Sequence, residues 1–233
     1  MPESAAARRA RARRLLGQLE RAYPDAAIAL RFETPLQLLV ATILAAQCTD
    51  ERVNQVTPAL FRAYPTADDL AGADPATLEG EIRSTGFFRA KTRAIMGMAR
   101  ALVERHGGEV PRTLDALTAL PGVGRKTANV VLGNAFGIPA IAVDTHVFRV
   151  SQRLGLAKAD DPDQVEDQLA EVIPRPRWTR FCHLLQAHGR RVCAARAPAC
   201  PTCPVRALCP WPGKTAAARP SAGGRRPSRA RKG

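Results

Sequence analysis

Along most of the chain, apolar residues recur every three or four positions, which is the period of one face of an α-helix. The clearest segment starts at Thr34-Pro35, where an N-cap threonine precedes a proline at the first helical position. Gln37 is placed to close a capping box there. The apolar stripe and its continuation at helical spacing comprise Leu36, Leu39, Val40, Ile43, Leu44 and Gln47.

Similar signals mark further helices. Starts are expected at Asp74-Pro75, near Phe88, at Thr113, near Arg125 and at Asp161-Pro162, and stops at Gly107-Gly108 and Gly137. Their apolar stripes include Leu78 and Ile82, then Ile95, Ala99, Leu102 and Val103, then Leu114, Leu117 and Leu120, and finally Val165, Leu169 and Val172. No convincing run of strands alternates with them, because residues 140–143 are too short to count. The pattern therefore predicts an all-α fold.

Length and composition place this fold in a broad class. A chain of 233 residues is long enough for one large domain or two small ones with a hydrophobic core. No apolar run approaches the roughly 18–20 residues of a membrane span, and no apolar segment follows the Arg-rich N-terminus as it would in a secretory signal. We expect a cytoplasmic protein with no membrane partner. Residues 214–233 lack large apolar side chains and should be disordered, and the first dozen residues should be loose as well.

The net charge of +14 is unevenly distributed. Residues 1–171 contain 21 basic and 21 acidic side chains, whereas residues 172–233 contain 14 basic ones and none that is acidic. A block of one sign suits a polyanion, and the usual cellular polyanion is nucleic acid. A basic tail that only keeps the protein soluble is the alternative.

The string LPGVGRKTA at 120–128 lies between two predicted helices. Gly122 and Gly124 allow a tight turn with bare backbone N–H groups just before a helix N-terminus, which is a ready anion site. The longer glycine spacing and preceding strand of a nucleotide P-loop are missing. The two glycines alone would suit an ordinary turn between helices, but the full string resembles the helix–hairpin–helix of DNA glycosylases.

Lys126 lies in the first turn of the second helix of this motif. The positive end of the helix dipole and partial burial would both favour the neutral form of its amine. A neutral amine can attack a sugar carbon and form a Schiff base. An isolated lysine at this position would more simply bind a DNA phosphate.

The string IAVDTHVFR at 141–149 places Asp144 directly before another predicted helix. Such an aspartate is most often only an N-cap, but capping does not exclude catalysis. A carboxylate there could stabilise positive charge on a deoxyribose or help to activate the attacking amine. His146 is either a residue of the helix surface or a phosphate contact.

Four of the six cysteines crowd together as Cys193-x6-Cys200-x2-Cys203-x5-Cys209. Thiols of a cytosolic protein stay reduced, so such a cluster indicates a metal site rather than disulfides. A zinc ribbon would have two close pairs, and the bacterial ferredoxin run has shorter gaps. Four thiolates in one loop suit a [4Fe–4S] cluster, with zinc as the alternative. Cys48 and Cys182 stand apart, and nothing in the sequence assigns them a role.

In this order, the three motifs resemble the endonuclease III family of DNA glycosylases and abasic-site lyases, over roughly residues 15–212. The resemblance implies two helical domains with the active site in the cleft between them. A six-helix domain with the hairpin would span 27–138, a cluster domain would combine 1–26 with 139–212, and 213–233 would be a disordered basic tail. The implied protein is a monomer in the bacterial nucleoid. It would remove oxidised pyrimidines from duplex DNA and nick the strand by β-elimination.

The resemblance also implies roles for single residues. Lys126 would be the nucleophile and Asp144 its catalytic partner. Gln47 would enter the space that the extruded base leaves, and Phe87 would be either an apolar wedge or a core residue. The remaining implied DNA contacts are Gly122, Gly124, Arg125 and His146, and the implied cluster ligands are Cys193, Cys200, Cys203 and Cys209. Ala45 stands where many relatives have serine, which leaves the lesion pocket in question.

Two rival functions remain open from the sequence. The adenine glycosylase branch shares the cluster and the aspartate, but it usually lacks the hairpin lysine and carries a further C-terminal domain. A non-catalytic helix–hairpin–helix module would bind DNA without cutting it. The presence of both Lys126 and Asp144 argues against the module.

Overall fold

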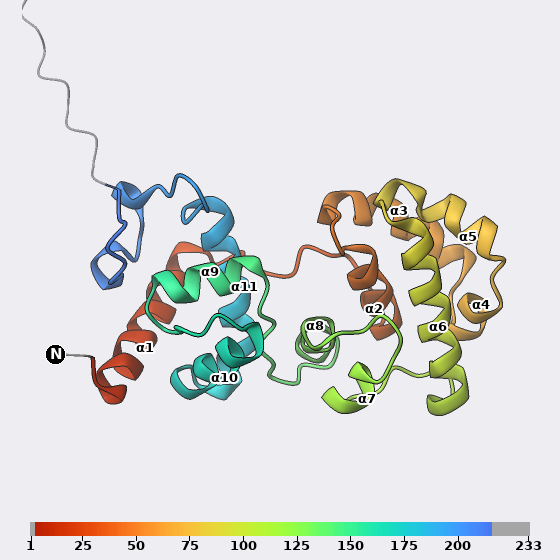
Figure 1. The fold of residues 1–233 in the computed structure, drawn as a ribbon, viewed down its shortest axis with the longest axis horizontal. Helices are drawn as coiled ribbons and strands as arrows, with labels where there is room; N and C mark the ends of the chain where they lie inside the picture. The colour runs from red at the N-terminus through yellow and green to blue at the C-terminus, as the bar shows by residue number, and fades with distance from the viewer. Residues whose placement is uncertain (1–2, 216–233) are drawn as a thin grey trace, which may run out of the picture.

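A computed structural model describes residues 3–215 of the chain, so nearly all of the expected basic tail lies outside the described part. The helices gather into two lobes, with α8 between them (Figure 1). The expectation of an all-α fold is confirmed, since residues 3–215 contain helices and no strand. None of the helices in this part of the chain has the length and hydropathy that a membrane crossing requires.

The larger lobe surrounds a hydrophobic core drawn from residues 30–140. Its elements are α2 (Pro35–Leu44), α3 (Asp50–Ala63), α4 (Ala67–Gly72), α5 (Pro75–Ile82), the 3-10 helix η1 (Arg83–Thr85), α6 (Phe88–His106), α7 (Leu114–Thr118) and α8 (Arg125–Ala135). These are seven α-helices within described residues 35–135, where the family resemblance implied six. Two of them are short, since α4 has six residues and α7 has five.

The other lobe has a separate core, which residues 12–26 and 141–208 build together. Its elements are α1 (Ala5–Ala22), α9 (Thr145–Arg153), α10 (Pro162–Val172), the 3-10 helix η2 (Arg175–Arg177), α11 (Trp178–Arg191) and the 3-10 helices η3 (Cys200–Thr202) and η4 (Arg206–Leu208). The N-terminal helix therefore packs beside segments that follow it by more than 100 residues (Figure 1).

The capping signals of the sequence are realised at several helix starts. The side chains of Thr34, Asp74 and Asp161 each accept a hydrogen bond from the first turn of α2, α5 and α10, respectively. Helix α6 ends at Gly107, whose φ of 60° is left-handed, as a glycine stop requires. Local side-chain chemistry thus sets these boundaries as expected.

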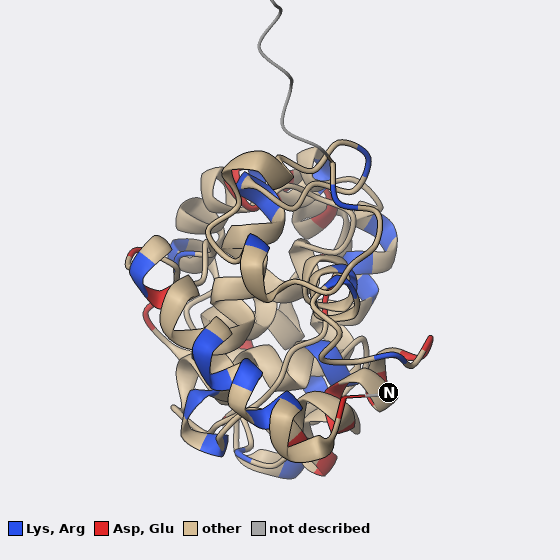
Figure 2. Cartoon of the chain, turned by 90° about the vertical axis from the view of Figure 1, so that its left-hand side faces the viewer, with Lys and Arg blue, Asp and Glu red and all other residues tan. Residues whose placement is uncertain are grey.

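The expectation of a loose N-terminus is wrong from residue 5 onward. Helix α1 begins at Ala5, and its buried Leu15, Leu16 and Leu19 anchor it in the second core. Arginine side chains hold its first turns, because Arg11 donates to Glu3 at 2.7 Å and Arg9 donates to the Glu171 carbonyl at 3.1 Å. Lys and Arg are spread over several helices of this lobe together with Asp and Glu (Figure 2).

Helix α8 joins the two lobes through a close contact with α11. A Cβ atom on Gly133 would lie 2.6 Å from Thr179 Oγ1, so only glycine allows this approach of the two helices. Thr179 also bonds to the Ala140 backbone, accepting from its N–H at 3.3 Å. The helix that carries Lys126 is therefore fixed against both cores.

Candidate active site

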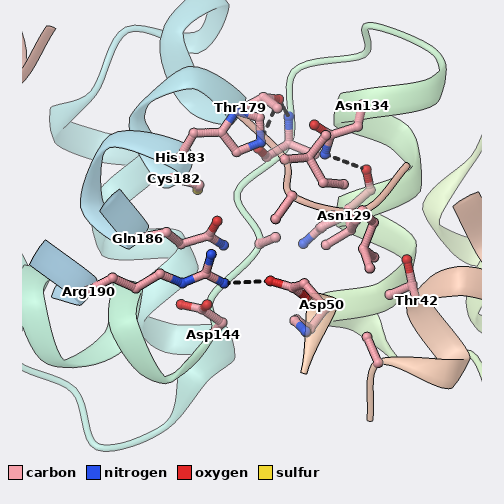
Figure 3. A pocket seen from close by; sticks show the side chains of 18 residues that line it. Thr42, Asp50, Asn129, Asn134, Asp144, Thr179, Cys182, His183, Gln186 and Arg190 are labelled. Carbon is pink, nitrogen blue, oxygen red and sulfur yellow. Dashed lines mark hydrogen bonds and ion pairs between the residues drawn. The ribbon is translucent and has the colours of Figure 1, made fainter. Parts of the chain in front are cut away.

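A pocket opens between the two cores. Residues of α2 and α8 line one side, and residues 140–144 and α11 line the other. Both Lys126 and Asp144 belong to this lining, so the fold brings together two residues that are 18 positions apart. Figure 3 shows Arg190 reaching from α11 to Asp50, with Asp144 close to the same guanidinium group.

Lys126 is the second residue of α8 and is exposed, so the expected partial burial is wrong. The start of α8 has no side-chain cap, because Gly124 occupies the N-cap position, and no acidic residue lies in its first turn. The backbone N–H groups there remain open, and the positive end of the helix dipole is close to the amine. The amine thus stands at an anion-binding helix start beside the pocket.

Asp144 caps α9 and also lines the pocket, so a catalytic role for its carboxylate stays a prediction. Its Oδ1 atom accepts from the His146 N–H at 2.9 Å and from the Val147 N–H at 2.7 Å, which caps α9. Its Oδ2 atom lies 3.4 Å from His146 Nδ1. The side chain is 17 % exposed and lines the pocket. One oxygen thus holds the helix start, while the other remains near the pocket with His146 as its neighbour.

Arg125 does not project freely from the hairpin. Its Nε and Nη2 atoms donate to Glu166 of α10 at 2.9 and 3.1 Å, a bidentate ion pair. This hydrogen bonding with Glu166 raises the pKa of Arg125 above its usual value. Asn129 also donates to Glu166, at 2.8 Å, and to the Ile141 carbonyl at 2.9 Å. These bonds tie α8 to the other lobe, and a DNA contact by Arg125 stays a prediction.

Several other pocket residues belong to no motif of the sequence. Arg190 of α11 donates to Asp50 of α3 at 2.9 Å and so bridges the lobes at the pocket (Figure 3). Burial raises the pKa of the Cys182 thiol to about 12 and lowers the pKa of the His183 imidazole below its usual value. Such contacts join distant parts of the chain, which no local motif marks.

The two hairpin glycines differ in their surroundings. Gly122 has a φ of 74°, and a Cβ there would lie 2.6 Å from the Ala94 side chain of α6. Gly124 has an ordinary φ of −87°, and a Cβ there would meet no atom within 4 Å. Its missing side chain therefore leaves the start of α8 accessible to a ligand, as an anion site needs.

Gln47 and Phe87 are the only non-glycine residues of the described chain with positive φ, at 52° and 48°. Helix α2 ends at Leu44, so Gln47 lies in the following loop and not on the predicted helical stripe. Phe87 is 64 % exposed, which excludes the core-packing alternative. Both residues line one surface hollow together with Gly122. Exposed tips with a strained backbone are typical of functional sites.

The four clustered cysteines line one small cavity near α11. Basic side chains surround it, since Arg153 donates to Cys193 Sγ at 3.4 Å and Lys214 donates to the Cys209 carbonyl at 2.7 Å. Among residues 3–215, no carboxylate lines this cavity. Within residues 3–215, no three potential ligands are arranged to hold a single metal ion.

Comparisons with known proteins agree with this architecture. Residues 40–175 match the family described as "HhH-GPD superfamily base excision DNA repair protein". The chain is 55 % identical to endonuclease III of Synechocystis over 206 residues, which cover 88 % of this chain and 94 % of the relative. It is 43 % identical to endonuclease III of Escherichia coli over 200 residues, which cover 84 % and 93 %.

Solved structures extend the similarity to three dimensions. A structure described as a non-covalent endonuclease III–DNA complex superposes with a TM-score of 0.82 at 46 % identity, covering 87 % of this chain and 95 % of the other. A trapped covalent endonuclease III–DNA intermediate superposes with a TM-score of 0.83 over the same shares. The chain therefore belongs to the endonuclease III family of the HhH-GPD superfamily of base excision DNA repair proteins.

Proposed function

We propose that this protein is a bifunctional DNA glycosylase and abasic-site lyase that removes oxidised pyrimidines from duplex DNA. The observation that carries the proposal is the shared pocket of Lys126 and Asp144, which lies beside an open helix start. Relatives of this chain were captured on DNA both non-covalently and covalently. A covalent intermediate suits an enzyme whose nucleophile is an amine.

In the proposed reaction, the damaged nucleotide leaves the base stack and its sugar reaches the pocket. The neutral Lys126 amine attacks C1′, the bond from C1′ to the base breaks, and the base departs with a proton. The Asp144 carboxylate stabilises positive charge that develops on the sugar. The lysine nitrogen then expels O4′, which takes a proton, so the sugar ring opens to a protonated Schiff base. This Schiff base makes the C2′ proton acidic, and loss of that proton expels the 3′ phosphate oxygen. Water then releases the lysine.

We propose further that Gln47 and Phe87 enter the duplex where the base has left, and that Gly122, Gly124, Arg125 and His146 contribute to DNA contact around them. The exposure of Phe87 and the open helix start at Gly124 support this assignment. Backbone N–H groups at a helix start bind phosphate and position the duplex without reading its sequence.

We propose that Cys193, Cys200, Cys203 and Cys209 bind a [4Fe–4S] cluster. All four line one cavity among basic side chains, which suits an anionic group. Each iron of such a cluster takes one thiolate, so the ligands need not converge on a single point as they do around zinc. The bound cluster would cross-link the C-terminal loop and so contribute to folding.

The two hydrophobic cores support a division into a hairpin domain at 27–138 and a cluster domain that combines 1–26 with 139–212. All six cysteines are free within the described chain, which suits a reducing compartment. We therefore place the protein in the cytoplasm, on the DNA of the bacterial nucleoid.

An oligonucleotide with one thymine glycol tests the proposed function. The protein should release the base, nick the strand and become covalently linked to the DNA when borohydride is present. Base release from an A·8-oxoguanine mismatch instead, without nicking, would indicate an adenine glycosylase. Binding without base release or nicking on either substrate would indicate a non-catalytic module.

A further inference from the structure

Lys91 is a buried lysine whose ammonium group connects two loops. The residue is 5 % exposed, and its Nζ atom donates to the Leu44 carbonyl at 2.7 Å and to the Thr85 carbonyl at 2.8 Å. Burial lowers the pKa of Lys91 from its usual value. Burying a charged group is costly unless hydrogen bonds compensate it, so these two bonds are the main support for this side chain.

Both acceptors lie directly before segments of the proposed DNA interface. Leu44 ends α2, and Gln47 follows it by three residues. Thr85 ends η1, and Phe87 follows it by two residues. A single ammonium group therefore connects the starts of the two loops and fixes the distance between them.

The hairpin rests on the same helix. Ala94 of α6 follows Lys91 by three residues, so the two side chains share a face of the helix. The Ala94 side chain leaves no space for a Cβ on Gly122. Lys91, Ala94 and Gly122 line the hollow around which Gln47 and Phe87 stand.

From this geometry we infer that Lys91 is a positioning residue, which holds Gln47 and Phe87 at the spacing at which both enter the duplex together. The inference rests on the proposed function, because it assumes that these two side chains contact DNA. Left-handed backbone at a non-glycine residue is unfavourable, so the surroundings must maintain it. The hydrogen bonds from Lys91 hold both loops where they begin, close to the two residues with left-handed backbone.

The main test is the variant Lys91→Met, which keeps the length of the side chain and removes its donors. The probe is a duplex with a tetrahydrofuran abasic-site analogue opposite 2-aminopurine, whose fluorescence reports disturbed stacking at the site. The variant should bind this duplex about tenfold more weakly, which equals about 1.4 kcal/mol. The 2-aminopurine signal on binding should fall, while affinity for the undamaged duplex stays within about twofold.

A background without the inserted side chains distinguishes positioning from general stabilisation. In the Gln47→Ala/Phe87→Ala protein, Lys91→Met should cause no further loss of affinity for the abasic duplex. An equal loss in both backgrounds, or an equal loss on undamaged DNA, would overturn the inference. Where Lys91→Met does not fold, Lys91→Gln takes its place, because its amide can still donate to one carbonyl.

Thr92→Val is the matched control. Thr92 is the next residue of α6, is 1 % exposed, and its Oγ1 atom has no hydrogen-bond partner within the described chain. The control should bind both duplexes like the parent protein. A parent protein that fails to nick thymine-glycol DNA would contradict the proposed function. A parent that nicks normally, with a Lys91→Met variant equal to it in binding and fluorescence, would contradict the positioning role alone.

Discussion

Replacing Glu166 with glutamine should loosen the attachment of the helix that carries Lys126. Glu166 accepts two hydrogen bonds from Arg125 and one from Asn129, all between 2.8 and 3.1 Å. Glutamine removes the charge and leaves one oxygen for three donors. Arg125, next to Lys126, would then lose its bidentate partner.

The expected loss of stability in Glu166→Gln follows from how far the ion pair is buried. The Glu166 side chain is 16 % exposed and the Arg125 side chain is 38 % exposed, so solvent screens the pair in part. Exposed ion pairs contribute about 0–1 kcal/mol, and breaking a fully buried pair costs about 3–5 kcal/mol. We expect Glu166→Gln to lower the free energy of unfolding by about 1–2 kcal/mol. For a chain of this size, that corresponds to a decrease in Tm of about 2–8 °C.

A double-mutant cycle of Glu166→Gln and Arg125→Gln, followed by urea unfolding, measures the interaction directly. The variant Glu171→Gln is the matched control, because Glu171 is 61 % exposed and pairs with Arg8 at 3.4 Å. Its effect should stay below about 0.5 kcal/mol. A coupling energy below about 0.3 kcal/mol between Arg125 and Glu166 would refute the reasoning.

Three further predictions test the site. Asp144→Asn should reduce turnover at least about a hundredfold with little change in stability, because asparagine caps a helix equally well; an activity within a few-fold of the parent would leave Asp144 as a cap alone. Cys200→Ser should lose the visible absorption of an iron–sulfur cluster and destabilise the C-terminal loop, and stoichiometric zinc without iron in the anaerobically purified parent would exclude the cluster. Iodoacetamide at pH 8 should modify the half-buried Cys48 and spare Cys182, which is 3 % exposed with a pKa of about 12; rapid modification of Cys182 in the folded protein would contradict its placement in the core.

The sequence predicted those local features whose interacting residues all lie within one short segment. Capping side chains and glycine stops set several helix ends as predicted, because their partners lie within five residues. The helical periodicity predicted the position of Gln47 wrongly, because the period continues in the sequence although the helix ends at Leu44. The prediction failed at α1 as well, because the leucines of α1 pack in the second core and Arg9 bonds to the Glu171 carbonyl, both far along the chain.

The site was only partly predictable for a similar reason. The pairing of Lys126 with Asp144 came from the family resemblance, and no spacing rule places them in one pocket. Lys91 and Glu166 escaped notice because their partners lie up to 47 and 41 positions away in the sequence. Glu166 and Asp163 belong to the helix that starts at Asp161-Pro162, and only the folded chain brings both to Arg125.

The most direct test of the central claim identifies the atom that joins DNA. The protein is incubated with thymine-glycol duplex and borohydride, the covalent product is digested, and mass spectrometry locates the modified residue. We expect one reduced adduct on Lys126, and no adduct with Lys126→Gln although that variant still binds the duplex. An adduct on a different residue, or undiminished trapping and nicking by Lys126→Gln, would exclude Lys126 as the nucleophile.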